Sequence, residues 1–376
     1  MSAGAGSDEK MHRLAVWQLG RVEYDDGLRL QKLFGQARAR ELAPDSLLLL
    51  EHPPVLTLGR GAKRRNIVTA ESQLAALGVD VFETDRGGDV TYHGPGQIVG
   101  YPIFRLPAER HDVRRYVRDL EECIIRASRR FGIEAERIPK WPGVWLSAGR
   151  ARPEKIAAIG VHISRWQTSH GFALNVNTDL SHFQLIVPCG IQEGGVTSMQ
   201  RELGRALEIA EVEAELARSF GEVFDGQIEM KRPAMETVSV AVLRLDEGEP
   251  RVLLLRRVPS RGAFWQIVTG RIEKGESPSE AAAREAMEET GKPLQVVPLN
   301  YRHSFALGEN IPPRVVEESA FVAFWKRGSD LRIDPKEHDS FRWLSLDEAV
   351  KTLPYNGLRK ATLLAAAVGK GRMPTD

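Results

Sequence analysis

The sequence from Arg86 to Pro102 reads RGGDVTYHGPGQIVGYP, and this stretch decides the fold of the larger part of the chain. It holds five glycines and two prolines, yet it lies between apolar segments typical of strands. Gly87 and Gly88 allow a positive φ and a close approach of the backbone to a ligand. With Arg86 and His93 beside them, such a loop is suited to enclosing an acyl chain or a nucleotide. The alternative is a tight hairpin in which the histidine is hydrogen-bonded within the protein.

The stretch resembles the signature of the octanoyltransferases that begin protein lipoylation, a branch of the biotin/lipoate ligase superfamily. In that family it lines the acyl tunnel. Three further segments carry the resemblance in the family's order: Glu51–Arg60 (EHPPVLTLGR), Lys155–Gly160 (KIAAIG) and Pro188–Ile191 (PCGI). The match extends from about Val16 to about Phe224. It implies an α/β fold of the biotin/lipoate ligase kind, a mixed sheet with helices.

The composition predicts a two-domain soluble protein. The chain has 376 residues, too many for one ordinary domain, with 42% hydrophobic and 27% charged residues. A net charge of +1 favours neither nucleic acid nor membrane, and no apolar run is long enough to span a bilayer. Two cysteines cannot form a disulfide framework, and residues 1–12 lack the pattern of a signal peptide. We therefore predict a disordered tail over 1–12 and a location in the bacterial cytoplasm.

The pattern changes after Phe224, where charged residues and a proline follow without periodicity. This change predicts a transferase-like domain over 13–225, a linker over 226–235 and a second domain over 236–370. Strand-like runs resume after the linker, which marks the start of the second domain.

Helices are predicted in the first domain as well. Apolar residues at three- and four-residue steps predict a helix over Asp112–Phe131, with Cys123 on its apolar stripe. That position makes Cys123 a small core residue and not a nucleophile. A further helix is predicted over Ala206–Phe220, with Glu211 and Glu213 on its exposed side.

Cys189 is the candidate nucleophile of the first domain. It lies in Val-Pro-Cys-Gly-Ile, between a proline that fixes the backbone and a glycine that frees the next turn. A thiolate both attacks and leaves well, and a nearby lysine lowers the thiol pKa. Lys155 opens a predicted strand, but spacing alone cannot pair it with Cys189. The resemblance implies that pairing, with Cys189 as acyl-thioester nucleophile and Lys155 as its activator and general acid/base.

The resemblance also implies which residues line the substrate channel. They are Arg86, Gly87, Gly88, Asp89, Val90, Thr91, Tyr92, His93, Ala158, Ile159, Gly160, Gly171, Phe172 and Ala173. His93 and His170 are candidates for stabilising the oxyanion or orienting the dyad, and equally for a structural role.

The reaction implied by the resemblance has two steps. Octanoyl-acyl carrier protein acylates Cys189, and the target lysine of a lipoyl domain then takes the acyl group. Such domains occur in 2-oxoacid dehydrogenases and in the glycine cleavage H protein. The transferase would need no cofactor, because the incoming thioester is already activated.

Two alternatives compete with the transferase. An ATP-dependent lipoate ligase carries a similar loop, usually with Asp-x-Gly-Asn after the histidine. Here Gly94-Pro95-Gly96-Gln97 follows His93 and matches the transferase branch. A zinc site built from His93, His170 and Cys189 matches no compact zinc spacing.

A second motif, Gly270–Gly291, reads GRIEKGESPSEAAAREAMEETG. Ser277 followed by Glu280 predicts a capping box at the start of a helix, and Gly291 predicts its end. Three carboxylates then share one helix face: Glu285, Glu288 and Glu289. They repel one another unless a cation lies among them, and a hard ion such as Mg²⁺ suits carboxylates and diphosphate oxygens.

This spacing resembles the Nudix box, which implies an α/β/α sandwich and hydrolysis of a nucleotide or related diphosphate with Mg²⁺ or Mn²⁺. Carried over, Glu285 and Glu289 are metal ligands, Glu288 and Glu276 assist, and Arg284 braces the carboxylates. The alternative is a binding module that senses a nucleotide without cleaving it.

Overall fold

The computed structural model describes residues 12–187, 194–246, 249–326, 328 and 330–369. The chain divides into two compact units, Met1–Arg232 with Ala306–Arg314, and Pro233–Phe305 with Val315–Asp376. Of the predicted tail, only His12 is described. Across the described residues, no helix is both long and apolar enough to cross a membrane.

The first unit is built on a nine-stranded mixed sheet with the order β12-β1-β2-β6-β10-β9-β8-β7, and β11 pairs with β9. Its strands are β1 (Arg13–Arg21), β2 (Asp45–Glu51), β6 (Gln97–Ile103), β7 (Glu136–Ile138), β8 (Trp141–Leu146), β9 (Glu154–Ser164), β10 (Gln167–Asn175), β11 (Gly195–Val196) and β12 (Gln227–Lys231). The predicted mixed sheet with helices is confirmed. The central strand β2 is buried along almost its whole length, as its aliphatic run predicts.

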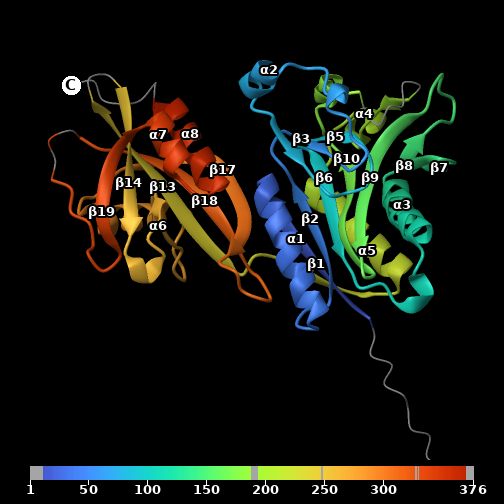
Figure 1. Ribbon diagram of the computed structural model, residues 1–376, viewed down its shortest axis with the longest axis horizontal. Helices are drawn as coiled ribbons and strands as arrows, with labels where there is room; N and C mark the ends of the chain where they lie inside the picture. The colour runs from blue at the N-terminus through green and yellow to red at the C-terminus, as the bar shows by residue number, and fades with distance from the viewer. Residues whose placement is uncertain (1–11, 188–193, 247–248, 327, 329, 370–376) are drawn as a thin grey trace, which may run out of the picture. The chain divides into compact units, whose positions relative to one another are not determined.

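Helices cover both faces of this sheet (Figure 1). They are α1 (Tyr24–Ala39), α2 (Glu71–Ala76), α3 (Val113–Arg130), α4 (Met199–Leu203) and α5 (Ile209–Phe224), with 3₁₀ turns at Arg64–Asn66, Ala108–Arg110 and Leu180–Leu185. Helix α3 begins where Asp112 caps it by accepting hydrogen bonds from two backbone N–H groups. Its apolar stripe joins α5 in the main core, and α1 covers the opposite face. Cys123 is fully buried in that core, which confirms the prediction for it.

Helix α5 begins three residues and ends four residues later than predicted, and one of its glutamates lies on the other side. Glu211 is exposed as expected, but Glu213 is buried. Because α5 packs against both α3 and strand β1, its buried surface is wider than one apolar stripe. Glu213 lies on the side nearer β1, where it accepts a hydrogen bond from Gln18 at 2.8 Å.

The signature stretch runs through two different sheets. Strand β5 (Val90–His93) joins a three-stranded sheet, β4-β3-β5, with β3 (Val55–Leu58) and β4 (Asp80–Glu83). Strand β6 instead pairs with β2 and β10 in the large sheet. The chain crosses from one sheet to the other at Gly94–Gly96. A Cβ on Gly96, which has φ of +79°, would lie 2.6 Å from the backbone of Asn177. The stretch is therefore not a hairpin.

The segment predicted as a linker is largely a strand. Residues Gln227–Lys231 form β12, which pairs in parallel with β1 from Arg13↔Gln227 to Trp17↔Lys231. In this segment Ile228 and Met230 alternate with polar residues, so it has no continuous apolar run, and the prediction missed so short an alternation. The division between the units falls between Arg232 and Pro233, inside the predicted linker.

The second unit is built on a seven-stranded sheet with the order β15-β14-β13-β18-β17, to which β16 and β19 add through β13 and β14. Its strands are β13 (Met235–Asp246), β14 (Glu249–Arg257), β15 (Trp265–Gln266), β16 (Val268–Arg271), β17 (Val296–Leu307), β18 (Arg314–Phe324) and β19 (His338–Ser345), with a 3₁₀ turn at Pro259–Arg261.

Three helices complete this unit as a sandwich. Helix α6 (Pro278–Thr290) packs in a core on one face of the sheet, and α7 (Leu346–Thr352) and α8 (Asn356–Gly369) share the core on the other. The predicted α/β/α sandwich is confirmed. The capping box of Ser277 and Glu280 is present, and Gly291 ends α6 with φ of +74°.

Candidate active sites

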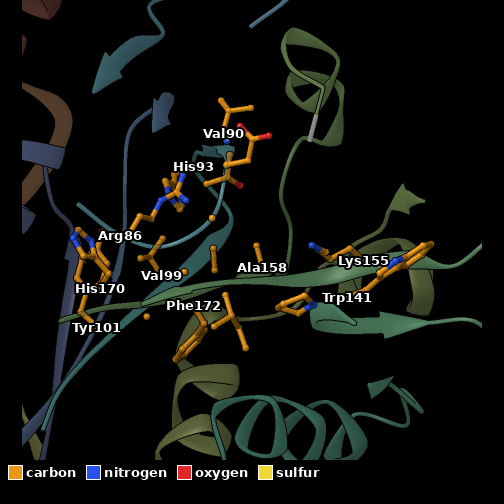
Figure 2. Close-up of a pocket in the computed structure, with 18 of the residues that line it drawn as sticks. Arg86, Val90, His93, Val99, Tyr101, Trp141, Lys155, Ala158, His170 and Phe172 are labelled. Carbon is orange, nitrogen blue, oxygen red and sulfur yellow. Dashed lines mark hydrogen bonds between the residues drawn. The ribbon is translucent and has the colours of Figure 1, made fainter. Parts of the chain in front are cut away.

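A cavity of about 330 Å³ lies in the first unit, at the signature stretch. Strands β9 and β10 form one side of it, and the segment from Arg86 to His93 forms another. Figure 2 shows Lys155 and Trp141 at one end of the cavity and His170 and Tyr101 at the other. The volume is within the range of small-molecule sites.

The antiparallel register of β9 and β10 brings two predicted groups of residues together. Gly171 lies opposite Gly160, Phe172 opposite Ile159, and Ala173 opposite Ala158. A Cβ on Gly171 would lie 2.1 Å from the carbonyl oxygen of Gly100 on β6. Glycine at this position therefore lets β10 approach β6 closely beneath the cavity.

Arg86 lies in the cavity wall, but its guanidinium is bonded to groups behind the wall. It donates to the carbonyl oxygen of Thr57 at 2.6 Å and to the Thr57 hydroxyl at 2.8 Å. Thr57 is fully buried and does not line the cavity. Such charge-assisted bonds satisfy a buried cation and fix the loop in place.

Two further side chains of the wall, His93 and Tyr101, also bond to residues behind it. The Nδ1 atom of His93 lies 2.8 Å from the Gln97 side-chain oxygen, and the Tyr101 hydroxyl lies 2.7 Å from Nε2 of His52. Neither Gln97 nor His52 lines the cavity. Because these polar atoms are bonded to residues behind the wall, the cavity presents mainly carbon to its contents.

Burial also keeps these histidines neutral. Burial, with the neighbouring His52, lowers the pKa of His93 to about 3. Burial lowers the pKa of His52 to about 4. Burial lowers the pKa of His170 as well, although the hydrogen bond that its ring makes to the Asp85 carboxylate opposes this change. Neutral, internally bonded His93 favours the structural alternative for this residue.

Lys155 is placed by its strand and by one aromatic ring. On β9 it is the register partner of Trp145, and its ammonium lies 4.6 Å from the centre of a Trp145 ring. This is a cation–π contact. Lys155 also lines a smaller cavity of about 40 Å³ together with Gly194. The predicted nucleophile Cys189 lies outside the described residues, as does its segment 188–193.

In the second unit, Arg284 gathers the carboxylates around the start of α6. Its guanidinium donates to both oxygens of Glu276, at 2.9 and 3.0 Å, and to Glu285 at 2.8 Å. Its contact with the exposed Glu288 is longer, at 3.4 Å. The hydrogen bonds from Arg284 hold the pKa of Glu276 below its usual range.

Glu289 differs from the other carboxylates because it is buried. Its Oε2 has no hydrogen-bond partner among the described residues, and the nearest ion-pair partner, Nε2 of His338, lies 3.9 Å away. Burial raises its pKa well above the usual range, and the charge of Glu285 adds to this. A Cβ on Gly270 would overlap the carboxylate of Glu285, so glycine leaves room for that side chain.

These residues fit a divalent metal by their chemistry. Over the described ranges, no three His, Cys, Asp or Glu side chains converge closely enough to form a ready metal site. The donor set nonetheless consists of hard carboxylate oxygens, and one of them is buried without a partner. A dication among Glu285 and Glu289 would satisfy that oxygen and relieve the repulsion between the two side chains.

Comparison with known proteins identifies the family of each unit. Residues 23–221 match the family model of the lipoyl protein ligase A/B catalytic domain. An octanoyltransferase of Myxococcus xanthus is 59% identical over 358 residues, covering 95% of this chain and 100% of that protein. The chain belongs to the octanoyltransferase family. Because that alignment covers 95% of the chain, it includes the second unit, where residues 235–366 match the Nudix domain model.

Two further comparisons concern the transferase unit. An octanoyltransferase of Koribacter versatilis is 51% identical over 217 residues, covering 57% of this chain and 86% of that protein. The bi-partite lipoate protein ligase of Thermoplasma acidophilum is similar in structure, with a TM-score of 0.48 and 18% identity. That comparison covers 59% of this chain and 88% of the other.

Most of the residues predicted to line the substrate channel of this octanoyltransferase lie around the cavity. Those that line it are Arg86, Gly88, Asp89, Val90, Thr91, His93, Ala158, Ile159, Gly160, Gly171, Phe172 and Ala173. Gly87 and Tyr92 do not. The N–H of Gly87 donates to Val161 at 2.9 Å, and Tyr92 is buried, with its ring stacked on His182.

Sequence reasoning missed several residues of the cavity. They are Tyr24, Val99, Tyr101, Lys140, Trp141 and Pro142. Val99 and Tyr101 lie on β6, inside the quoted signature. The signature could therefore have indicated them. Tyr24 and Trp141 come from distant segments, and nothing in their local sequence indicates that they contribute to this wall.

Proposed function

We propose that this member of the octanoyltransferase family transfers octanoate from octanoyl-acyl carrier protein to the target lysine of a lipoyl domain, through a thioester on Cys189. The observation that carries the proposal is the cavity itself. Its wall turns polar atoms away from the contents, which suits an acyl chain, and Lys155 lies at one end. The reducing bacterial cytoplasm is the proposed compartment, because it keeps a nucleophilic cysteine as a thiol.

In the first step, the Cys189 thiolate attacks the octanoyl carbonyl carbon. The bond to the carrier's sulfur breaks, and the carrier leaves as a thiol after gaining a proton. In the second step, the lysine amine of the lipoyl domain attacks the new thioester. The bond from Cys189 to the acyl carbon breaks, an amide forms, and the amine gives up a proton. Lys155 is assigned to both proton transfers, as the group that stabilises the thiolate and returns the proton.

Two observations support the pairing of Lys155 with Cys189. Lys155 and Gly194 line the same small cavity, and Gly194 is five positions after Cys189 in the sequence. Five extended residues reach at most about 18 Å, so the segment is long enough for Cys189 to approach the ammonium group. The only other cysteine, Cys123, is buried in the core under α3.

The test uses the purified full chain with octanoyl-acyl carrier protein and an isolated lipoyl domain, without ATP and with EDTA. Octanoylation of the lipoyl domain is expected under these conditions. Cys189→Ser is expected to abolish it, and the matched control Cys123→Ser is expected to retain it. A strict requirement for ATP would contradict the proposal and favour the lipoate ligase alternative.

For the second unit we propose metal-dependent hydrolysis of a nucleotide or related diphosphate. Glu285 and Glu289 would hold Mg²⁺ or Mn²⁺, with Glu288 assisting from its exposed position. Such a metal supplies charge neutralisation on the diphosphate and an activated water. Arg284 positions the site, since it binds Glu276 and Glu285 at once and so fixes the middle of α6 against the loop before it.

The test measures phosphate and pyrophosphate release from a panel of nucleoside triphosphates and dinucleotides, with and without Mg²⁺. Hydrolysis of at least one compound is expected with the metal and not with EDTA. Tight binding of a compound that is never cleaved would replace the catalytic proposal with the sensor alternative.

A further inference from the structure

A second cavity of about 350 Å³ lies in the first unit, bounded by α1 and the start of β10. It is separate from the cavity beside Lys155, but the two share a wall. His170 is the one described residue that lines both. The residues on either side of His170 line different cavities: Ser169 lines the second and Gly171 lines the first.

The side chain of His170 is held firmly in this wall. Its Nε2 lies 2.7 Å from a carboxylate oxygen of Asp85, and its backbone N–H donates to the side-chain oxygen of Gln31 at 2.7 Å. The ring of Tyr101 meets it edge-on, and only 4% of the residue is exposed. Its backbone has φ of +54°, a conformation that favours glycine or asparagine over most side chains.

His170 lies at the end of the first cavity that is far from Lys155 (Figure 2). If the reacting carbonyl lies near Lys155, the methyl end of the acyl chain points toward His170 and Tyr101. A chain that extends past this end of the cavity meets the His170 ring. Beyond that ring is the second cavity, whose lining is mixed. Leu28, Gly35 and Ala39 contribute to it beside polar residues such as Gln31, Gln36 and Gln167.

We propose that His170 is a specificity-determining residue, which closes the acyl cavity and limits the chain that this enzyme accepts. The inference rests on the proposed acyl transfer at the same site. Asp85 holds the His170 ring in the closing position, and Gln31 holds its backbone. Removal of the ring joins the two cavities into one continuous space.

The experiment compares acyl carrier protein charged with octanoyl, decanoyl, dodecanoyl and tetradecanoyl chains, with kcat/KM measured for the wild type and for His170→Gly. Glycine adopts the positive φ without strain, so the variant removes the ring and leaves the backbone conformation accessible. Each further methylene that finds room is worth about fourfold in kcat/KM. The ratio of dodecanoyl to octanoyl transfer is therefore expected to rise by about two orders of magnitude at most.

His162→Ala is the matched control. His162 also pairs with Asp85, at 3.0 Å, but it lines neither cavity. It is expected to leave the chain-length profile unchanged. If His170→Gly does not fold, His170→Asn is measured in its place, because asparagine tolerates this backbone and its side chain is shorter than the imidazole.

The two proposals fail in different ways. If the wild type transfers octanoate and the chain-length profile of the His170 variant equals that of the wild type, the closing role is wrong and the proposed function stands. If the wild type transfers no acyl group, the proposed function is wrong. Calorimetric binding of free octanoate and dodecanoate to both proteins then tests the closing role separately, and equal selectivity in both would overturn it.

Discussion

Glu213 is expected to destabilise the first unit at neutral and alkaline pH, and Glu213→Gln is expected to remove that penalty. The carboxylate is buried on α5 and accepts one hydrogen bond, from Gln18. Burial raises its pKa from 4.5 to about 7, although the bond from Gln18 opposes the change. Gln keeps the shape and the acceptor oxygen for Gln18 while removing the charge.

The magnitude follows from linkage between protonation and folding. A Glu whose pKa is higher in the folded state binds its proton more tightly there, so stability is highest at low pH and falls as the pH rises. The loss begins near pH 4.5 and is complete above about pH 7. At about 1.36 kcal/mol per pKa unit, the cost at pH 8 is about 3 kcal/mol. Glu213→Gln should therefore stabilise the unit by an amount of that order at pH 8 and by almost nothing near pH 4.

Amide hydrogen exchange in peptides from α5 and the main sheet measures this free energy in the full chain, separately from the second unit. Glu211→Gln is the matched control, because Glu211 is exposed on the same helix. It is expected to change stability by less than about 0.5 kcal/mol at either pH. Equal effects of Glu213→Gln at both pH values, or destabilisation at pH 8, would refute the reasoning from burial.

Two further predictions concern the active sites. Lys155→Met should lower kcat/KM for octanoyl transfer by about 10²–10⁴-fold and alter its pH profile. The control Lys140→Gln, in the same cavity, should have little effect. An unchanged pH profile in Lys155→Met would show that this lysine takes no part in the proton transfers. Glu289→Gln should abolish metal-dependent hydrolysis while octanoyl transfer stays intact, and a hydrolysis rate equal to wild type would show that Glu289 is not needed.

The sequence predicted those parts of the fold in which local pattern and burial agree. Helix α3 has one apolar stripe and a capping Asp112, and it was placed to within a residue at each end. Helix α6 was predicted by its capping box and Gly291. Strand β12 was missed because its short alternation of apolar and polar residues has no continuous apolar run. Glu213 was misplaced because a helix between a sheet and another helix buries more than one stripe.

The candidate site was predictable only where a motif marked it. The resemblance placed Ala158–Gly160 and Gly171–Ala173 in one channel. The strand register explains why they lie together, since the two segments pair across β9 and β10. Tyr24 was missed because its place in the wall depends on long-range packing. The signature alone does not show where its polar side chains point. Arg86 and His93 bond to groups behind the wall and leave the cavity largely apolar.

The most direct measurement is peptide mass mapping of the full chain after brief incubation with octanoyl-acyl carrier protein and no lipoyl domain. An octanoyl adduct is expected on the peptide that contains Cys189, labile to hydroxylamine as a thioester is, and absent from the Cys123 peptide. Addition of the lipoyl domain should discharge it with transfer of octanoate to the domain's lysine. Rapid transfer to the lipoyl domain with no acyl adduct on Cys189 at any time, or an undiminished rate in Cys189→Ser, would contradict the thioester mechanism.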